Sequence, residues 1–217
     1  MPAETSTPIS DFDELAARAA SLIVPGERRI LGITGSPGAG KTTLAGRIVK
    51  RLNDSGAHVG YLPMDGFHLA NSKLDRRRIR DRKGAVDTFD GWGFVGLLRR
   101  ILVETDHPVY APSFERTIDE PIAGEIEIPS RTTLVVVEGN YLLLDAEPWS
   151  QIPGLLAQTW FCATPESDRL DRLIDRHIRH GRSPEAARTW ARTVDGTNAV
   201  LIEQTRTRAD LVVSGSL

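Results

Sequence analysis

Hydrophobic and polar positions divide the chain into short apolar runs and longer stretches in which apolar residues recur every three or four positions. The apolar runs are typical of strands buried in a parallel sheet and lie at 30–34, 58–63, 134–137, 160–163 and 209–214. The helical spacing predicts helices at 11–23, 42–54, 92–103, 165–180 and 185–206. Residues 107–130 mix prolines with short apolar runs and predict brief strands. Strands that alternate with helices in this way indicate an α/β fold.

The segment 30–63 has the order strand, loop, helix and strand, which is a βαβ unit whose ligands collect at the carboxyl ends of the strands. Ser10 and Asp13 form a capping-box-like pair before the first predicted helix, so residues 1–28 are expected to be a helical extension. No repeat or linker divides the sequence of 217 residues. We therefore expect a single domain over 1–217.

A glycine-rich loop lies between the first apolar run and the helix that follows it. It fits the pattern G-x-x-x-x-G-K-[ST] and consists of Gly35, Ser36, Pro37, Gly38, Ala39, Gly40, Lys41 and Thr42. Backbone N–H groups of such a loop hold phosphate oxygens, and the helix start adds the positive end of its dipole. Lys41 is expected to reach the β- and γ-phosphates, the Thr42 hydroxyl to join the Mg²⁺ shell, and Thr43 to extend the nucleotide site. The loop predicts ATP and Mg²⁺ as cofactors.

Glu138 ends the apolar run 134–137, so its carboxylate is expected at the same sheet edge as the glycine-rich loop. There it would hold Mg²⁺ through water, although a surface charge at a strand end is the alternative interpretation. The chain contains neither N-K-x-D, which reads guanine in GTPases, nor the L-S-G-G-Q run of transport ATPases. These absences argue against a GTPase and a transport ATPase, and the length of the chain argues against a motor.

Four further segments carry a resemblance. In chain order they are Met64–His68, Lys83–Asp90, Tyr110–Arg116 and Val136–Leu144. Together with the phosphate loop they resemble the uridine kinase, bacterial pantothenate kinase and phosphoribulokinase superfamily over about 30–213, and most of all its small bacterial nucleoside, fructose or pantothenate kinase-like members. The resemblance implies a three-layer P-loop NTPase fold, with a mostly parallel sheet flanked by helices. It also implies an acceptor-binding region at 66–130 and an arginine-rich lid at 166–190.

The resemblance further implies an ATP-dependent phosphotransferase that moves the γ-phosphate to a hydroxyl of a small metabolite. In that superfamily the aspartate after the second strand is the catalytic base, and Asp65 occupies its place. Such a carboxylate orients the attacking hydroxyl and accepts its proton late in the reaction. A turn cap with Gly66 is the alternative interpretation of Asp65. His68 is assigned either to substrate contact or to packing.

The predicted helix 165–180 carries four arginines at helical spacing on one face, Arg169, Arg172, Arg176 and Arg179. Similar kinases have a lid here whose arginines close over ATP and stabilise charge on the transferred group, which makes Arg172 and Arg176 catalytic candidates. Arg182, at the break after this helix, is a further nucleotide-binding candidate. The i,i+4 pairs of Asp168 with Arg172 and of Asp175 with Arg179 allow an ordinary solvated helix face instead.

The region between Asp65 and Arg116 is expected to form the acceptor pocket, because it follows the base and lies over the sheet edge. The substrate-binding candidates are Asp65, His68, Asp87, Phe89, Tyr110, Arg116, Asn140 and Tyr141. Phe89 and Tyr110 are alternatively core residues. Uridine kinases resemble D-H-P-D-A-F-D where this chain begins with Gly84, so the first acid, a ribose ligand there, is absent. A pantothenate-like or sugar-like acceptor is therefore an alternative to a nucleoside acceptor.

The composition of the chain limits the kinds of binding partner that we expect. The net charge of −2 and the lack of aromatic residues in the basic cluster 73–83 argue against nucleic acid, so this cluster is interpreted as a solvated helical segment or a substrate contact. A single cysteine, a polar start and the absence of a long apolar run lead us to expect a cytoplasmic protein without a membrane partner. A homodimer is left open. Two rival functions remain, a hydrolytic P-loop switch and a non-catalytic nucleotide-binding regulator.

Overall fold

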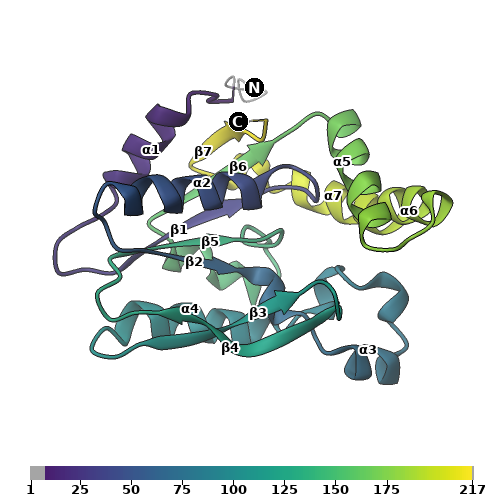
Figure 1. Cartoon of the computed structure of the whole chain (residues 1–217), viewed down its shortest axis with the longest axis horizontal. Helices are drawn as coiled ribbons and strands as arrows, with labels where there is room; N and C mark the ends of the chain where they lie inside the picture. Colours follow the sequence, from purple (N-terminus) through teal and green to yellow (C-terminus); the bar gives the residue numbers. More distant parts are fainter. Residues whose placement is uncertain (1–7, 217) are drawn as a thin grey trace.

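The structure, a computed structural model, describes residues 8–216 and is built around a five-stranded parallel sheet (Figure 1). The strand order is β2, β5, β1, β6, β7. The bounds in that order are Val59–Pro63, Leu134–Glu138, Arg29–Thr34, Gln158–Ala163 and Leu211–Ser214. Strand β1 pairs with both β5 and β6, so the loop that follows β1 leaves from the middle of the sheet. The predicted α/β P-loop fold is confirmed.

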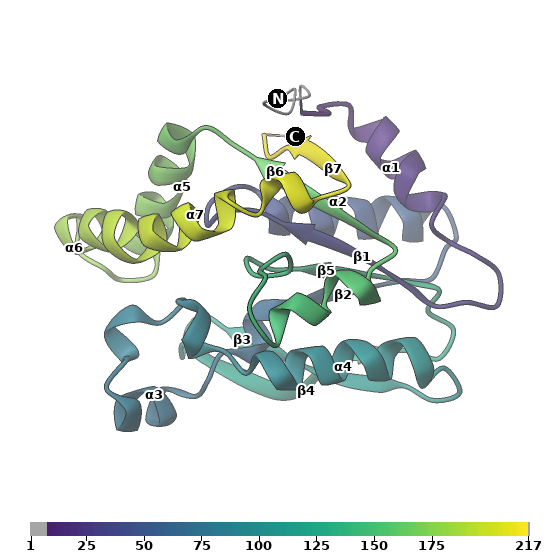
Figure 2. The ribbon, with the colours of Figure 1, turned by 180° about the vertical axis from the view of Figure 1, so that it is seen from behind.

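Helices cover both faces of the sheet, as the two opposite views show (Figures 1 and 2). On one face α1 (Phe12–Ala20) and α2 (Lys41–Asp54) pack against the odd-numbered side chains of β1, such as Leu31 and Ile33. On the other face α4 (Gly91–Val103) packs in a second core that contains Ile30. Alternate residues of one strand thus serve two cores, which explains why the strand sequences are apolar throughout.

A two-stranded antiparallel ribbon of β3 (Val109–Glu115) and β4 (Glu120–Ile128) lies beside α4 (Figure 1). The sequence predicted only brief strands here, whereas the structure has two strands of 7 and 9 residues. A register shift between Ala111 and Ser113, next to a proline, interrupts the pairing and explains the irregular pattern. Short helices complete this half of the chain, at Met64–Phe67, Asn71–Arg77 (α3), Arg80–Arg82, Val86–Thr88, Trp149–Gln151 and Pro153–Leu155.

The C-terminal helices are more broken than the sequence suggests. After α5 (Glu166–Arg179), the single helix predicted for 185–206 is in fact α6 (Pro184–Trp190), a π-helical turn (Ala191–Asp195) and α7 (Gly196–Glu203), followed by a short turn at Arg206–Arg208. Hydroxyls of threonines in this segment donate to carbonyls one turn earlier, with Oγ1–O distances of 2.8 and 2.6 Å for Thr193 and Thr197. Such side-chain bonds compete with the regular backbone hydrogen bonds of an α-helix, and here they accompany the π-turn.

The first helix is capped by Asp11, not by the predicted pair of Ser10 and Asp13. A carboxylate oxygen of Asp11 accepts hydrogen bonds from the backbone N–H groups of Asp13 and Glu14, at 2.8 and 3.3 Å. Asp11 directly precedes the helix and has the extended backbone of an N-cap, so its short side chain reaches the free N–H groups of the first turn. Within residues 8–216, none of the helices combines the length and apolar character needed to cross a bilayer.

Candidate active site

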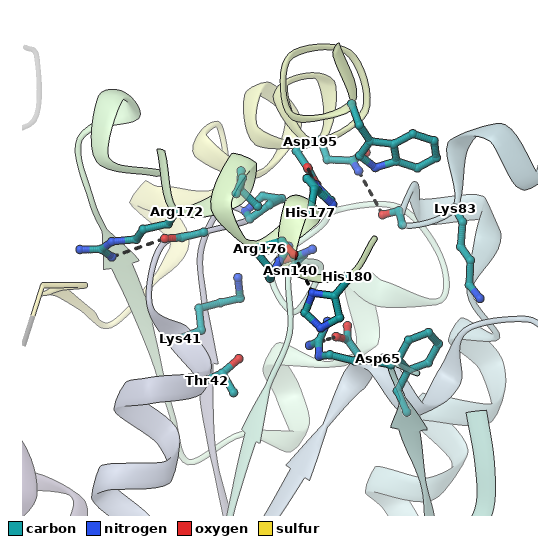
Figure 3. A pocket seen from close by; sticks show the side chains of 18 of the residues that line it. Lys41, Thr42, Asp65, Lys83, Asn140, Arg172, Arg176, His177, His180 and Asp195 are labelled. Carbon is teal, nitrogen blue, oxygen red and sulfur yellow. Dashed lines mark hydrogen bonds and ion pairs between the residues drawn. The ribbon is translucent and has the colours of Figure 1, made fainter. Parts of the chain in front are cut away.

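A cleft of about 1070 Å³ opens at the carboxyl ends of the parallel strands. One wall is the phosphate loop (35–42) with the start of α2, and the opposite wall comes from the turn after β2 and from the segment 80–89. Helix α5 and the junction of the π-turn with α7 close it from a third side (Figure 3). Segments far apart in sequence meet here because parallel strands end at one edge.

The phosphate loop has the backbone that its glycines allow. Gly40 precedes α2 with φ +94°, and a Cβ atom placed there would lie 2.3 Å from the carbonyl oxygen of Gly215. Lys41 begins α2 and donates from Nζ to the carbonyl oxygen of Ser36 at 3.0 Å. Burial lowers the pKa of Lys41, and the charge of Glu138 is the strongest influence in the opposite direction. The ammonium is thus held inside the loop, where phosphate oxygens would contact it.

Glu138 lies at the end of β5 beside the phosphate loop, and its side chain is buried. Its Oε1 accepts hydrogen bonds from Oγ1 of Thr42 at 3.0 Å and from the hydroxyl of Tyr61 at 3.1 Å. Burial and the charge of Asp65 raise the pKa of Glu138, while Lys41 and the two hydroxyl groups lower it. A buried carboxylate next to a threonine hydroxyl and a phosphate loop offers the oxygen ligands that suit Mg²⁺. Both predicted metal ligands are therefore adjacent.

Asp65 lies in the turn Met64–Phe67 that follows β2, and its side chain faces the cleft (Figure 3). Its Oδ2 accepts a hydrogen bond from Nη2 of Arg116 at 3.3 Å. The charge of Asp65 acts on both Lys41 and Glu138, which places it within electrostatic reach of the phosphate loop. The structure thus brings the predicted base, the predicted metal ligand and the phosphate loop to one cleft.

His68 packs between aromatic rings at the acceptor end of the cleft. Its ring is stacked on Phe89 with a centroid distance of 3.9 Å, and Phe114 lies 4.9 Å away on another side. Its Nδ1 is buried and has no hydrogen-bond partner among the described residues. Burial lowers the pKa of His68 to about 4, so the ring is neutral near pH 7. His68 and Phe89 therefore serve packing and line the cleft at the same time.

The arginines of the predicted lid have different surroundings. Arg172 donates to the carbonyl oxygen of Gly215 at 3.0 Å and to the hydroxyl of Ser216 at 3.0 Å, and it points away from Asp65 in Figure 3. Arg176 lines the cleft, and no hydrogen bond of its guanidinium is found within residues 8–216. Arg182 stacks on Trp190 with its guanidinium 3.8 Å from the ring centre. Of the two catalytic candidates, Arg176 is thus the one whose donors are available to a phosphate, and Arg182 lines the cleft as well.

Neither of the two ion pairs that would mark α5 as an ordinary solvated face forms within the described part of the chain. Arg179 donates instead to the backbone carbonyl of Asp175, at 3.4 Å. Arg169, the first arginine of the series, is buried and donates to the carbonyl oxygen of Pro37 at 3.4 Å. Arg169 and Arg172, which also donates to the carbonyl oxygen of Gly38 at 3.5 Å, therefore contact the phosphate loop as structural supports.

Three of the acceptor candidates lie outside the cleft lining. Tyr110 is 54% exposed, because the alternation along β3 buries its neighbours and turns its ring outward. Asp87 pairs with Arg82 at 2.5 Å on the surface. Tyr141 is fully buried, and its hydroxyl donates to the carbonyl oxygen of Gly84 at 2.6 Å. Asn140 and Arg116, in contrast, line the cleft.

Three of the seven basic residues in the cluster 73–83 pair with acids, namely Arg80, Arg82 and Lys83. Arg80 pairs with Asp75 at 3.0 Å, and Lys83 pairs with Asp119 at 3.0 Å. Lys83 also donates to Oδ1 of Asn71 at 2.8 Å and lies in the cleft wall. The cluster thus shapes the acceptor end of the cleft through fixed ion pairs.

Several cleft or site residues escaped the sequence reasoning. Tyr61 is a strand residue with no local signal, and only the pairing of β2 with β5 brings its hydroxyl to Glu138. Asp195 and Asn198 also line the cleft. Their spacing of three places them on one side of a helix, which the sequence could have indicated, but nothing local shows that this side faces the cleft. His177, from α5, completes this group through a hydrogen bond to Asp195.

Comparison with known proteins agrees with this geometry. A Schizosaccharomyces pombe protein named as a candidate uridine kinase is 33% identical over 213 residues, which covers 94% of this chain and 91% of that protein. The chain belongs to the uridine kinase superfamily of P-loop kinases. An ATP-dependent kinase-like protein of Aspergillus versicolor is 33% identical over 162 residues, 70% of this chain and 94% of that protein. This kinase also matches a family described as Nephrocystin 3, N-terminal, over residues 19–78, under half of its length.

Solved structures place the kinase in the same group. The crystal structure of a candidate fructose transport system kinase from Silicibacter sp. TM1040 has a TM-score of 0.86 and 34% identity, and covers 93% of this chain and 98% of that one. The predictions of a kinase and of this superfamily are confirmed, and the protein is a P-loop kinase.

Proposed function

We propose that the protein transfers the γ-phosphoryl group of ATP to a hydroxyl of a small, pantothenate-like, sugar-like or nucleoside-like metabolite. The observation that carries the proposal is the meeting of Asp65, Lys41 and Glu138 in one cleft. One residue serves the acceptor, one the triphosphate and one the metal. In phosphoryl transfer the protein mainly positions the reactants and stabilises charge, and this arrangement provides both.

The phosphate end holds the nucleotide. Backbone N–H groups of 35–42 and the ammonium of Lys41 contact the β- and γ-phosphates, and Arg176 neutralises charge on the transferred group from α5. Thr42 and Glu138 would hold Mg²⁺, which would supply charge neutralisation for the triphosphate. The buried position of Glu138 and its bond to Thr42 at 3.0 Å support this assignment.

The acceptor end orients the hydroxyl. Asp65 accepts a hydrogen bond from it and takes its proton as the bond to phosphorus forms. Arg116 holds Asp65 in place through the contact at 3.3 Å. His68, Phe89 and Asn140 form the surface against which the acceptor lies. The charged and aromatic groups together favour a polar metabolite with several hydroxyls or a carboxylate.

The test is a screen of the purified protein against pantothenate, nucleosides, hexoses, glycerate and pentose phosphates, with ADP release as the signal. With the best acceptor, Asp65→Asn is expected to lower kcat by roughly 10² or more and to leave ATP affinity nearly unchanged, because it alters only the acceptor contact. Asp81→Asn is the matched control, since Asp81 also lines the cleft but lies away from the reacting hydroxyl in this assignment.

The outcomes separate the hypotheses. Normal turnover by Asp65→Asn would show that another group serves the hydroxyl. ATP hydrolysis that none of these acceptors changes would contradict transfer to a metabolite and favour a hydrolytic switch. ATP binding without any turnover, unchanged in Asp65→Asn, would favour a regulator.

A further inference from the structure

The junction between the π-turn and α7 contacts two walls of the cleft with two buried polar side chains. Asp195, the last residue of the π-turn, accepts a hydrogen bond from Nε2 of His177 on α5 at 2.7 Å, in the tautomer that donates from Nε2. Asn198, three residues later, donates from Nδ2 to the carbonyl oxygen of Gly84 at 3.1 Å. Both residues are less than a tenth exposed. One side of this short segment therefore joins the arginine helix to the acceptor wall.

On the arginine side, Asp195 acts on the residue next to its partner. Arg176 precedes His177 on α5, and its guanidinium is largely withdrawn from water. Burial lowers the pKa of Arg176, and the charge of Asp195 is the strongest influence that raises it. A buried carboxylate at this place holds α5 through His177 and favours the charged form of Arg176. The electrostatic surroundings of Arg176 at the cleft thus depend on Asp195.

On the acceptor side, Asn198 and Tyr141 donate hydrogen bonds to the same backbone carbonyl oxygen. The carbonyl oxygen of Gly84 accepts from the Tyr141 hydroxyl at 2.6 Å as well as from Asn198, so both of its lone pairs are used. The N–H of Gly84 donates to Oγ1 of Thr88 at 3.0 Å, which keeps the loop 83–89 compact. This loop ends with Phe89, on which His68 is stacked. A shift of Gly84 would therefore move the aromatic wall of the acceptor pocket.

We propose that Asp195 and Asn198 are positioning residues that couple the arginine helix α5 to the acceptor loop 83–89. Closure of α5 over a bound nucleotide carries the π-turn with it, and Asn198 transmits this movement to Gly84. The acceptor wall is then in place only when Arg176 is in place, which favours transfer to the acceptor over transfer to water. This inference rests on the proposed function for its catalytic consequence, but the coupling itself can be measured without an acceptor.

The acceptor-free test is amide hydrogen exchange with Mg²⁺ and the ATP analogue AMP-PNP. In the wild-type protein, the analogue is expected to slow exchange in α5 and, by a factor of about three to ten, in 83–89 as well, the range expected from one hydrogen bond. Asn198→Asp keeps the size of the side chain but removes the donor. In this variant the slowing in α5 is expected to remain and that in 83–89 to be lost.

Tyr141→Phe is the matched control, because it removes the other hydrogen bond to the same carbonyl oxygen from a segment outside α5–α7. It is expected to speed exchange in 83–89 with and without the analogue, while the slowing caused by the analogue persists. Equal behaviour of the two variants would overturn the coupling, because Asn198 would then only hold the loop. Slowing confined to α5 in the wild type would overturn it as well, and this measurement needs no variant to fold.

With an acceptor from the screen, the same variants give a kinetic test. Asn198→Asp is expected to lower kcat for transfer about tenfold and to raise the share of ATP lost to water, with Mg-ATP affinity within twofold of wild type. Tyr141→Phe is expected to raise the acceptor KM more than it lowers kcat. An unchanged ratio of transfer to hydrolysis in Asn198→Asp would contradict the coupling, whereas a failure to find any acceptor would contradict the proposed function and leave the exchange result standing.

Discussion

His68 makes the stability of this kinase depend on pH in a way that one substitution should remove. Its ring is stacked on Phe89, and its Nδ1 is buried without a hydrogen-bond partner among the described residues. Burial is the main cause that lowers the pKa of His68 from 6.5 to about 4. The charges that face the ring partly oppose each other, since Asp65 and Asp119 raise the pKa while Lys83 and Arg116 lower it. Burial therefore decides that the pKa of His68 is lowered.

The sign and size of the effect follow from linkage. Above pH 6.5 the imidazole is neutral in the folded and the unfolded chain, and His68 has no effect on the pH dependence. Between pH 6.5 and about 4 the unfolded chain binds the proton and the folded chain does not, so stability falls as the pH falls. With these two pKa values, the loss is about 2 kcal/mol at pH 5 and about 3 kcal/mol below pH 4.

The experiment compares His68→Phe with the wild type by urea unfolding at pH 7.5 and pH 5. Phenylalanine keeps an aromatic ring against Phe89 and cannot take up a proton. The free energy of unfolding is expected to fall between the two pH values by about 2 kcal/mol less in the variant than in the wild type. Other titrating groups contribute equally to both proteins and cancel. The same pH dependence in both proteins would refute the buried, neutral histidine.

Two further substitutions test the phosphate end of the cleft. Gly40→Ala is expected to lower the free energy of unfolding by about 1–2 kcal/mol or more and to weaken ATP binding, because φ is +94° and the new methyl group would meet the carbonyl oxygen of Gly215. Thermal unfolding measures the stability, and calorimetry measures the ATP affinity. Gly46→Ala is the control that should not destabilise the protein, because Gly46 lies in α2 with open space around it. Tyr61→Phe removes a hydrogen bond that lowers the pKa of Glu138, so the acidic limb of the pH–rate profile is expected to move to higher pH. An unmoved limb would mean that Glu138 does not control activity in that range.

The parallel core was predictable because each central strand is apolar on both sides. The predicted runs match β1, β2, β5 and β7 to within one or two residues. The ribbon of β3 and β4 was predicted less well, since it is half exposed, carries prolines and pairs with a register shift that no local pattern reveals. The sequence did not predict the π-turn, because the hydrogen bonds of the threonine hydroxyls compete with the backbone hydrogen bonds of the helix without changing the spacing of apolar residues.

Within the candidate site, residues fixed by a strand end were predictable and residues fixed by a distant partner were not. Glu138 ends β5, Asp65 lies in the turn after β2, and Lys41 begins the helix that follows the loop after β1, so the topology of one parallel sheet brings them together. Tyr110 illustrates the limit, because a motif at the right spacing does not say to which side of an irregular strand a ring points. Asn198 illustrates the converse, because its partner Gly84 lies 114 residues away.

The contrast between Arg172 and Arg176 shows why helical spacing alone cannot assign a role. Both lie on the same face of α5, one turn apart. The segment after β7 supplies the acceptors that Arg172 uses, namely the carbonyl of Gly215 and the hydroxyl of Ser216. Arg176 faces the acid Asp195 and the open cleft instead. A charge that is already paired adds little to a bound phosphate, whereas a desolvated and unpaired guanidinium interacts with it strongly. The segment that follows β7, and not the helix itself, therefore decides which of the two arginines keeps its donors free at the cleft.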